Sequence, residues 1–260
     1  MTIIIPLRLD VSCLLIIICL LLSACSVYVP LQPSAPLLRN KGETEVAANV
    51  YLSGRLEGSV AYSPVKHVVV RAAGGLQPSD EDSANFHIRQ FELGAGTYRS
   101  LSDRWLVGAL GGYGRGQGSR RFTENSFKYS GPDPNIRYNY SARFHKFYGE
   151  AFVAYENNWG TLGAAYRLSQ VHFASLTNNG APVDLRRMTR SEPMLFMRFG
   201  NRTGFLPWGQ FQLAFSTSWS PDYGKSFSSG EHRAYIKESR VFTSVGFVLY
   251  PHRLKAFATN

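Results

Sequence analysis

The amino-acid sequence predicts an all-β protein: a single antiparallel up-and-down transmembrane β-barrel of about ten strands. Three observations lead to this fold class. Charged residues make up 18% of the chain and aromatic residues 13%, whereas an average soluble domain contains about 25% charged residues. Runs of alternating polar and apolar residues, separated by turn-forming residues, follow one another from residue 43 to residue 250. Short and long connections alternate between these runs.

Residues 1–24 have the features of a secretory signal peptide. Arg8 precedes an apolar run from Val11 to Leu22, and a basic residue followed by a short apolar stretch is typical of an exported protein. The run is shorter than the roughly 20 residues that a membrane-spanning helix needs. We therefore expect export and no transmembrane helix.

The leader closes with Leu22, Ser23, Ala24 and Cys25. This quartet resembles the lipobox of bacterial lipoproteins. The resemblance implies that Cys25 becomes the first residue of the mature chain and carries a diacylglycerol and an amide-linked acyl chain such as palmitate, which together anchor a protein stably. We expect no other cofactor. The remaining cysteines lie in the leader, so the mature chain has no partner for an internal disulfide.

Residues 25–42 are expected to form a lipidated, proline-rich tether. Pro30, Pro33 and Pro36 are spaced by three, which favours extended, polyproline-like backbone. No acidic cluster that could act as a surface-export signal follows Cys25. We therefore expect the lipid anchor on the periplasmic side of an outer membrane.

The barrel is expected to occupy residues 43–250 and to leave a C-terminal tail at 251–260. Most of its strands reach or exceed the roughly 9 to 11 residues of a tilted membrane strand. The expected strands are 44–52, 56–63, 66–75, 87–99, 103–114, 139–155, 160–174, 190–200, 206–219 and 239–250.

The connections carry the strongest signal for a membrane barrel. Short ones at 63–65, 100–102, 156–158 and 201–204 are rich in turn-forming residues. Membrane barrels have short periplasmic turns, longer external loops and an even number of strands, so both chain ends are expected on the periplasmic side. The first hairpin, at 53–55, is the exception, being short where a long loop is expected. The long polar connections are 76–86, 115–138, 175–189 and 220–238.

Each strand examined has one apolar face. In 206–219, Phe211, Leu213 and Phe215 share one face and Gln210 and Gln212 the other. In a membrane barrel the apolar face points outward, and in a soluble barrel it points inward. Polar residues far from the loops would then line the lumen, where unlike charges can pair. We expect such a lumenal network at Glu92, Glu150, Arg167, Glu192 and Arg198.

Tryptophans flank the expected turns. Trp105, Trp159 and Trp208 stand near short turns, and Trp219 ends a strand beside a long loop. Tryptophan favours the membrane interface, so this placement is typical of the aromatic girdles of a membrane barrel.

Several segments resemble small outer-membrane β-barrel lipoproteins of unknown function. They are the lipobox, the proline-rich lead, Lys41-Gly42-Glu43, Ala61-Tyr62-Ser63-Pro64 and Gly111-Gly112-Tyr113-Gly114. The resemblance implies a fold and a location and contains no catalytic motif. The chain departs from it at the end, where Tyr250 is followed by ten more residues although such barrels often end on an aromatic residue. Phe257 could take that place.

The basic excess lies mainly in the expected long loops. The chain carries 28 Lys and Arg against 18 Asp and Glu. A partner with phosphorylated headgroups fits an envelope protein better than nucleic acid does. We expect outer-membrane lipid, and anionic glycolipid in particular, as the partner of these loops. The expected anion-binding residues are Arg115, Arg120, Arg121, Arg186, Arg187, Lys225 and Arg233.

The expected role is structural or surface interaction and not catalysis. Ten strands leave little free space, since about eight are already filled by side chains and open channels need roughly sixteen. One alternative is a lipid-tethered soluble periplasmic barrel that binds a small apolar ligand. A weaker alternative is a lipid-modifying enzyme built on His172, Ser175 and Asp184. The six histidines show no metal-ligand spacing.

Overall fold

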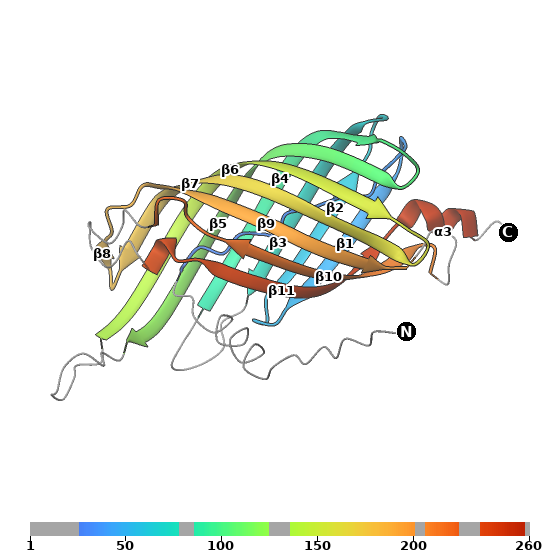
Figure 1. The fold of residues 1–260 in the computed structure, drawn as a ribbon. Coiled ribbons are helices and arrows are strands. Elements are labelled where there is room, and N and C mark those ends of the chain that lie inside the picture. Colours follow the sequence, from blue (N-terminus) through green and yellow to red (C-terminus); the bar gives the residue numbers. More distant parts are fainter. Residues whose placement is uncertain (1–25, 78–85, 125–135, 201–205, 224–234, 258–260) are drawn as a thin grey trace, which may run out of the picture.

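A computed structural model describes residues 26–77, 86–124, 136–200, 206–223 and 235–257 and shows a closed antiparallel β-barrel (Figure 1). It has ten long strands and one strand of two residues, β8, that pairs antiparallel with the end of β7. The strands are β1 (Thr44–Tyr51), β2 (Leu56–Tyr62), β3 (Val68–Gln77), β4 (Phe86–Ser100), β5 (Trp105–Glu124), β6 (Ile136–Glu156), β7 (Gly160–Asn178), β8 (Ala181–Pro182), β9 (Arg187–Phe199), β10 (Gly209–Ser218) and β11 (Arg240–Leu249).

Each long strand pairs with its neighbours in chain order, and β1 pairs with β11 to close the barrel. In this closing seam Val46 stands opposite Leu249, and Tyr51 opposite Ser244. The predicted all-β, up-and-down barrel of about ten strands is therefore confirmed. A helix, α3 (Pro251–Phe257), follows β11 in the segment expected to be a tail.

The prediction was wrong for the expected loop at 115–138. The described parts of it continue β5 and β6 as a paired ladder, in which Phe122 stands opposite Tyr138. Glycine has low strand propensity, so the glycine-rich stretch of β5 looked like a loop. On β6, aromatic rings compensate by covering the glycines: a Cβ at Gly116 would lie 2.5 Å from the ring of Phe144.

The apolar faces of the strands point outward. On β10, Phe211 is 57% and Leu213 45% exposed, whereas Gln210 and Gln212 are buried inside the barrel. The same holds on β6, where Phe147 is exposed and Lys146 is buried. This is the orientation that a membrane barrel requires and a soluble barrel excludes.

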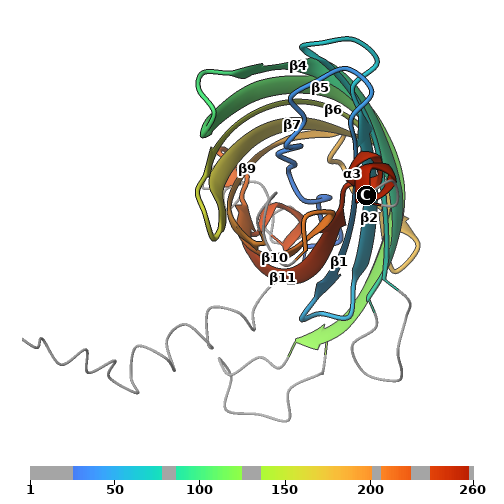
Figure 2. The ribbon, with the colours of Figure 1, turned by 90° about the vertical axis from the view of Figure 1, so that its right-hand side faces the viewer.

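The N-terminal segment lies inside the barrel (Figure 2). Residues 26–38, here called the plug, are almost completely buried, with Val27 and Tyr28 at 0% exposure. Residues 25–42 are expected to form a tether, and the structure shows that residues 26–38 are instead packed inside the barrel. The cause lies in the apolar residues of this segment, which gain more from burial than a solvated linker could.

The plug runs from one end of the barrel to the other. At one end the hydroxyl of Ser26 donates a hydrogen bond to the carbonyl oxygen of Ile236, in the connection between β10 and β11. At the opposite end Arg39 bonds to Ser102 O, in the turn between β4 and β5, and to Glu156. We call these ends the long-connection rim and the short-turn rim.

Gly42, with φ of 82°, then reverses the chain into β1. The plug crosses the lumen before β1 begins, so Ser26 lies at the long-connection rim, whereas Tyr250 lies at the short-turn rim. The chain ends themselves, which are expected on the periplasmic side, lie outside the described residues. No helix among the described residues is long and apolar enough to cross a membrane.

Candidate functional site

The lumen is built in three layers around the plug. An aromatic-rich apolar cluster fills the long-connection end, and a second apolar cluster fills the short-turn end. Charged side chains from the wall occupy the middle. Val27, Tyr28 and Val29 lie in the first cluster, Ala35, Leu37 and Leu38 in the second. Residues 30–34 cross the charged layer.

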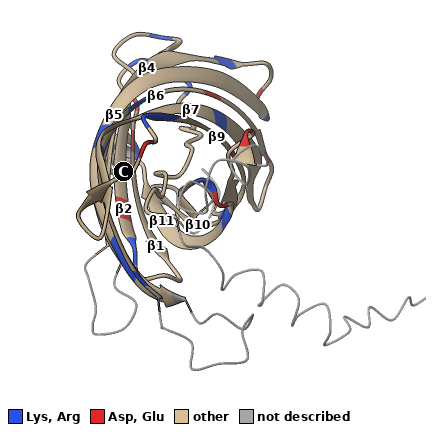
Figure 3. Ribbon diagram, turned by 90° about the vertical axis from the view of Figure 1, so that its left-hand side faces the viewer, with Lys and Arg blue, Asp and Glu red and all other residues tan. Residues whose placement is uncertain are grey.

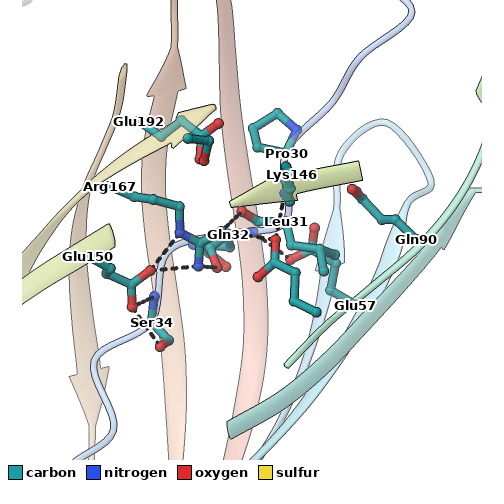
Figure 4. Close-up of polar contacts among 12 residues, drawn as sticks. Pro30, Leu31, Gln32, Ser34, Glu57, Gln90, Lys146, Glu150, Arg167 and Glu192 are labelled. Atoms are coloured by element: carbon teal, nitrogen blue, oxygen red, sulfur yellow. Dashed lines mark hydrogen bonds and ion pairs between the residues drawn. The ribbon is translucent and has the colours of Figure 1, made fainter. Parts of the chain in front are cut away.

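Glu92 on β4 is the centre of the middle layer. Its carboxylate lies 2.6 Å from Lys146 Nζ, 3.2 Å from Arg71 Nη1 and 3.2 Å from Arg167 Nη1. Arg167 also pairs with Glu150 at 2.6 Å. Burying charge is costly unless each ion is paired and hydrogen-bonded. The network meets this requirement by joining strands β3, β4, β6 and β7 across the lumen. Figure 4 shows Arg167 and Glu150 of this network beside the plug.

Wall carboxylates accept hydrogen bonds from the plug backbone. Glu57 accepts from the N–H of Gln32 at 3.1 Å, Glu150 from Ser34 at 3.0 Å and Glu45 from Leu37 at 2.8 Å. A buried backbone amide that lacks a partner is costly. Three other plug positions, Pro30, Pro33 and Pro36, have no N–H to satisfy. The proline spacing thus lowers the number of donors that the lumen has to match.

Wall cations and amides bind the plug carbonyl groups. Arg55 donates to the carbonyl oxygen of Pro30 at 3.0 Å, and Gln90 to that of Val29 at 2.8 Å. Arg167 donates to Leu31 O at 2.9 Å, and Arg198 to Ala35 O at 3.2 Å. All four contacts are to backbone oxygens, so the wall recognises mainly the extended backbone here. Side chains add to this, since Tyr51 and Ser244 both donate to Oε1 of Gln32.

At the long-connection end the plug is held by its own side chains. The Tyr28 ring packs edge-on against Phe144 with 5.1 Å between centroids. Its hydroxyl donates to Glu192 and accepts from Lys146. This single residue therefore connects the aromatic cluster to the charged layer.

All five residues of the expected lumenal network are buried inside the barrel, and four of them make ion pairs, which fall into two separate groups. Glu92, Arg167 and Glu150 meet directly. Arg198 forms a separate pair with Glu45 at 3.0 Å. Glu192 instead binds Tyr28 and Ser169. The structure adds further buried charged residues: Glu45, Glu57, Arg71 and Lys146, which alternation along their strands could have indicated, and Arg55, which lies in the turn before β2 and has no such signal.

The plug leaves little space in the lumen. The cavity between it and the β1–β3 side of the wall has a volume of about 30 Å³ and is lined by Gln32, Glu57 and Arg71 among others. That volume is close to the share of one water molecule in liquid water. This space is both too small and too polar for the small apolar ligand of the alternative hypothesis.

A band of basic residues lies on the outer face, toward the long-connection rim. Arg115 stands opposite His145, His145 opposite His172, and His172 opposite Arg187, along neighbouring strands. The His145 and His172 rings stack with centroids 5.2 Å apart. On β4, β5 and β6 the band lies two residues closer to the long-connection rim than the outward-facing residues Phe91, Tyr113 and Phe147. We call the following set the basic belt: Arg89, Arg115, Arg143, His145, His172 and Arg187.

Figure 3 shows the ribbon coloured by charge and seen from the long-connection rim. Arg115 and Arg121, expected in a loop, lie exposed on β5, and Arg187 lies exposed at the start of β9. Arg120 is half-buried on β5, with its guanidinium 5.8 Å from the Phe86 ring centre. Arg186 is exposed just before β9. Cys25 with its leader quartet, Lys225 and Arg233 lie outside the described residues.

The tryptophans flank the barrel as expected. Trp105 and Trp159 are 45% and 51% exposed at the short-turn rim, and Trp219 is 37% exposed near the other. In the weaker enzyme alternative, Nδ1 of His172 is buried and has no hydrogen-bond partner within the described chain. The described residues also hold no group of side chains suited to a metal ion.

No protein-family model matches the sequence, and no curated protein is similar to it. Several solved structures are similar. The outer membrane protease OmpT from Escherichia coli is 11% identical, with 81% of this chain and 94% of that chain covered and a TM-score of 0.45. The translocator domain of the autotransporter NalP from Neisseria meningitidis is 11% identical, with 80% and 86% covered and a TM-score of 0.43. The NanC porin is 12% identical, with 79% and 98% covered and a TM-score of 0.38. Similarity at this level carries no argument about activity.

Proposed function

We propose that this chain is an outer-membrane lipoprotein whose barrel is closed by its own plug and serves a structural, surface-interaction role without catalysis. The observation that carries the proposal is the outward apolar face combined with a filled lumen. Exposed Phe, Leu and Val side chains around a closed barrel are favourable in lipid and unfavourable in water. A lumen crossed by a bonded plug has no use as a wide pore.

The partner that best fits the basic belt is an anionic, phosphate-bearing glycolipid. The belt borders the apolar face on its long-connection side, which is where lipid phosphates would lie if the short turns are periplasmic. Basic side chains near a charged membrane surface contribute about 1 kcal/mol each. Arginine also binds phosphate oxygens in a forked geometry. Four exposed arginines on four strands would therefore hold headgroups along one side of the barrel.

The location is tested by fractionating the envelope and comparing gel mobility before and after boiling. We expect a compact, faster band in the outer-membrane fraction. Recovery of a folded barrel in the soluble periplasmic fraction, from the full-length chain, would refute the proposal.

Glycolipid binding is tested by replacing Arg89, Arg115, Arg143 and Arg187 with Gln. Because each arginine contributes about 1 kcal/mol, we expect the affinity for phosphorylated glycolipid in detergent to fall more than a hundredfold. A matched control replaces Lys66, Arg99 and Arg104, which are exposed at the short-turn rim, and should bind normally. If the belt variant and the control variant bound the glycolipid equally well, the proposal that the basic belt binds glycolipid would be refuted.

A further inference from the structure

We infer that the plug carries the lipid-bearing end of the chain through the barrel, so that Cys25 and its acyl groups lie on the long-connection side of the membrane. The inference rests on the proposed lipoprotein and membrane location. The sequence predicts the lipid anchor on the same side of the membrane as the short turns. The inference instead places the acyl chains in the opposite leaflet.

The first step is the length of the plug. Extended polyproline-like backbone advances about 3.1 Å per residue, so the thirteen residues from 26 to 38 cover roughly 40 Å. A hydrocarbon core is about 30 Å thick. The plug is thus long enough to pass from one side of a membrane to the other.

The second step is its direction. Backbone contacts follow the barrel axis in chain order: Val27 lies beside Gly118, where an added Cβ would be 3.0 Å from Val27 O, Leu31 contacts Arg167 and Leu37 contacts Glu45. Gly118 belongs to the part of β5 near the long-connection rim, and Glu45 begins β1 at the short-turn rim. The chain therefore enters at the long-connection rim and leaves at the short-turn rim.

The third step is covalent continuity. Cys25 is bonded to Ser26, whose side chain is held by the carbonyl group of Ile236 at 2.7 Å. One residue cannot span the lumen back to the short turns. An acyl group on Cys25 consequently meets the membrane near the long-connection rim.

The test inserts the same short epitope at three positions, each in the full-length chain: between Cys25 and Ser26, at Asn179–Gly180 in the turn after β7, and at Asn157–Asn158 in the turn after β6. Antibody binding is compared in intact and permeabilised cells, with folding checked by heat-modifiability. We expect the epitope after Cys25 to behave like that at 179–180. Behaviour like that at 157–158 would overturn the inference. Absence of all three proteins from the membrane would instead overturn the proposed function, and this inference with it.

A second variant tests threading without an insertion. A Cβ at Gly75 would lie 2.6 Å from Leu31 Cδ2, so Leu31→Cys with Gly75→Cys should form a disulfide in the folded, membrane-inserted protein. The matched control pairs Leu31→Cys with Gly74→Cys, one residue along β3 and facing the other way. A crosslink in the first pair alone supports threading. Its absence from folded barrels, or its presence in both pairs, would contradict it.

Discussion

In the middle layer of the lumen the wall supplies the side chains and the plug supplies mainly its backbone, whereas at both ends the plug contributes packed side chains of its own. The middle is thus tolerant of the plug sequence and intolerant of changes in the wall. At the ends both partners matter. The difference shows how a barrel can bind an extended chain tightly while fixing its position at only a few residues, such as Tyr28 and Leu38.

The largest expected effect comes from the wall of the middle layer. Glu92→Gln removes the carboxylate that pairs with Arg71, Lys146 and Arg167. Breaking a buried ion pair from one side costs about 3–5 kcal/mol. We expect the temperature at which the compact gel band is lost to fall strongly. As a control, Asp222→Asn removes a pair with Lys237 in which the aspartate side chain is 44% exposed, and should change the free energy of unfolding by under about 1 kcal/mol. If the two substitutions lowered stability equally, the buried ion pairs of the middle layer would contribute no more than the partly exposed pair at the rim.

A smaller effect is expected when plug side chains are shortened, and it should depend on the layer. Tyr28→Ala leaves a cavity in the aromatic cluster and removes the hydrogen bonds with Glu192 and Lys146, at a cost of about 3 kcal/mol. Ser34→Ala in the middle layer loses one hydroxyl contact with Glu150 but keeps the backbone N–H bond, at a cost of about 1 kcal/mol. Both variants are measured by the same thermal gel assay. If Ser34→Ala lowered the transition temperature as much as Tyr28→Ala, the conclusion that the wall recognises mainly the plug backbone in the middle layer would be wrong.

The smallest expected effect is a local pH dependence where the plug leaves the lumen. Partial burial would raise the pKa of Glu43, but hydrogen bonds from the Arg39 backbone and from Asn40, with His252 nearby, hold that pKa below its ordinary value of 4.5. A carboxyl group with a lowered pKa stabilises the fold above its ordinary pKa and loses this contribution as the pH falls. We expect the Arg39 amide to exchange faster at pH 3 than at pH 6, after correction for the intrinsic rate. Glu43→Gln should remove the difference, and an unchanged difference would assign it to another group.

Much of the barrel was predictable because alternation and turn chemistry act locally. Strand β10 was expected at 206–219 and is observed at Gly209–Ser218. The outward direction of Phe211 and Leu213 needed the structure, because alternation separates two faces without saying which is outside. The extension of β5 was hidden for a different reason. Its glycines lack strand propensity and are stabilised by rings on β6.

The plug was missed although its sequence contained a signal. Val27, Val29, Leu31 and Leu38 are too apolar for a solvated tether, and residues of this kind are usually buried. The prolines favoured an extended chain, which is correct in conformation, but local patterns do not tell where an extended chain lies. Its partners, such as Glu57 and Arg198, are distant in sequence. Pairing across such separations depends on barrel closure, which no local pattern encodes.

The path of the plug also determines the order in which the protein can assemble. One end of the plug continues covalently into β1, and β1 pairs with both β2 and β11. If the other end carries acyl chains, neither end is free to be drawn through a finished ring, so wall and segment form a mechanically interlocked pair. The lipid then has to be attached and in position before β1 and β11 meet. Closing that seam becomes the last step of folding, and opening it the first step by which the segment could be released.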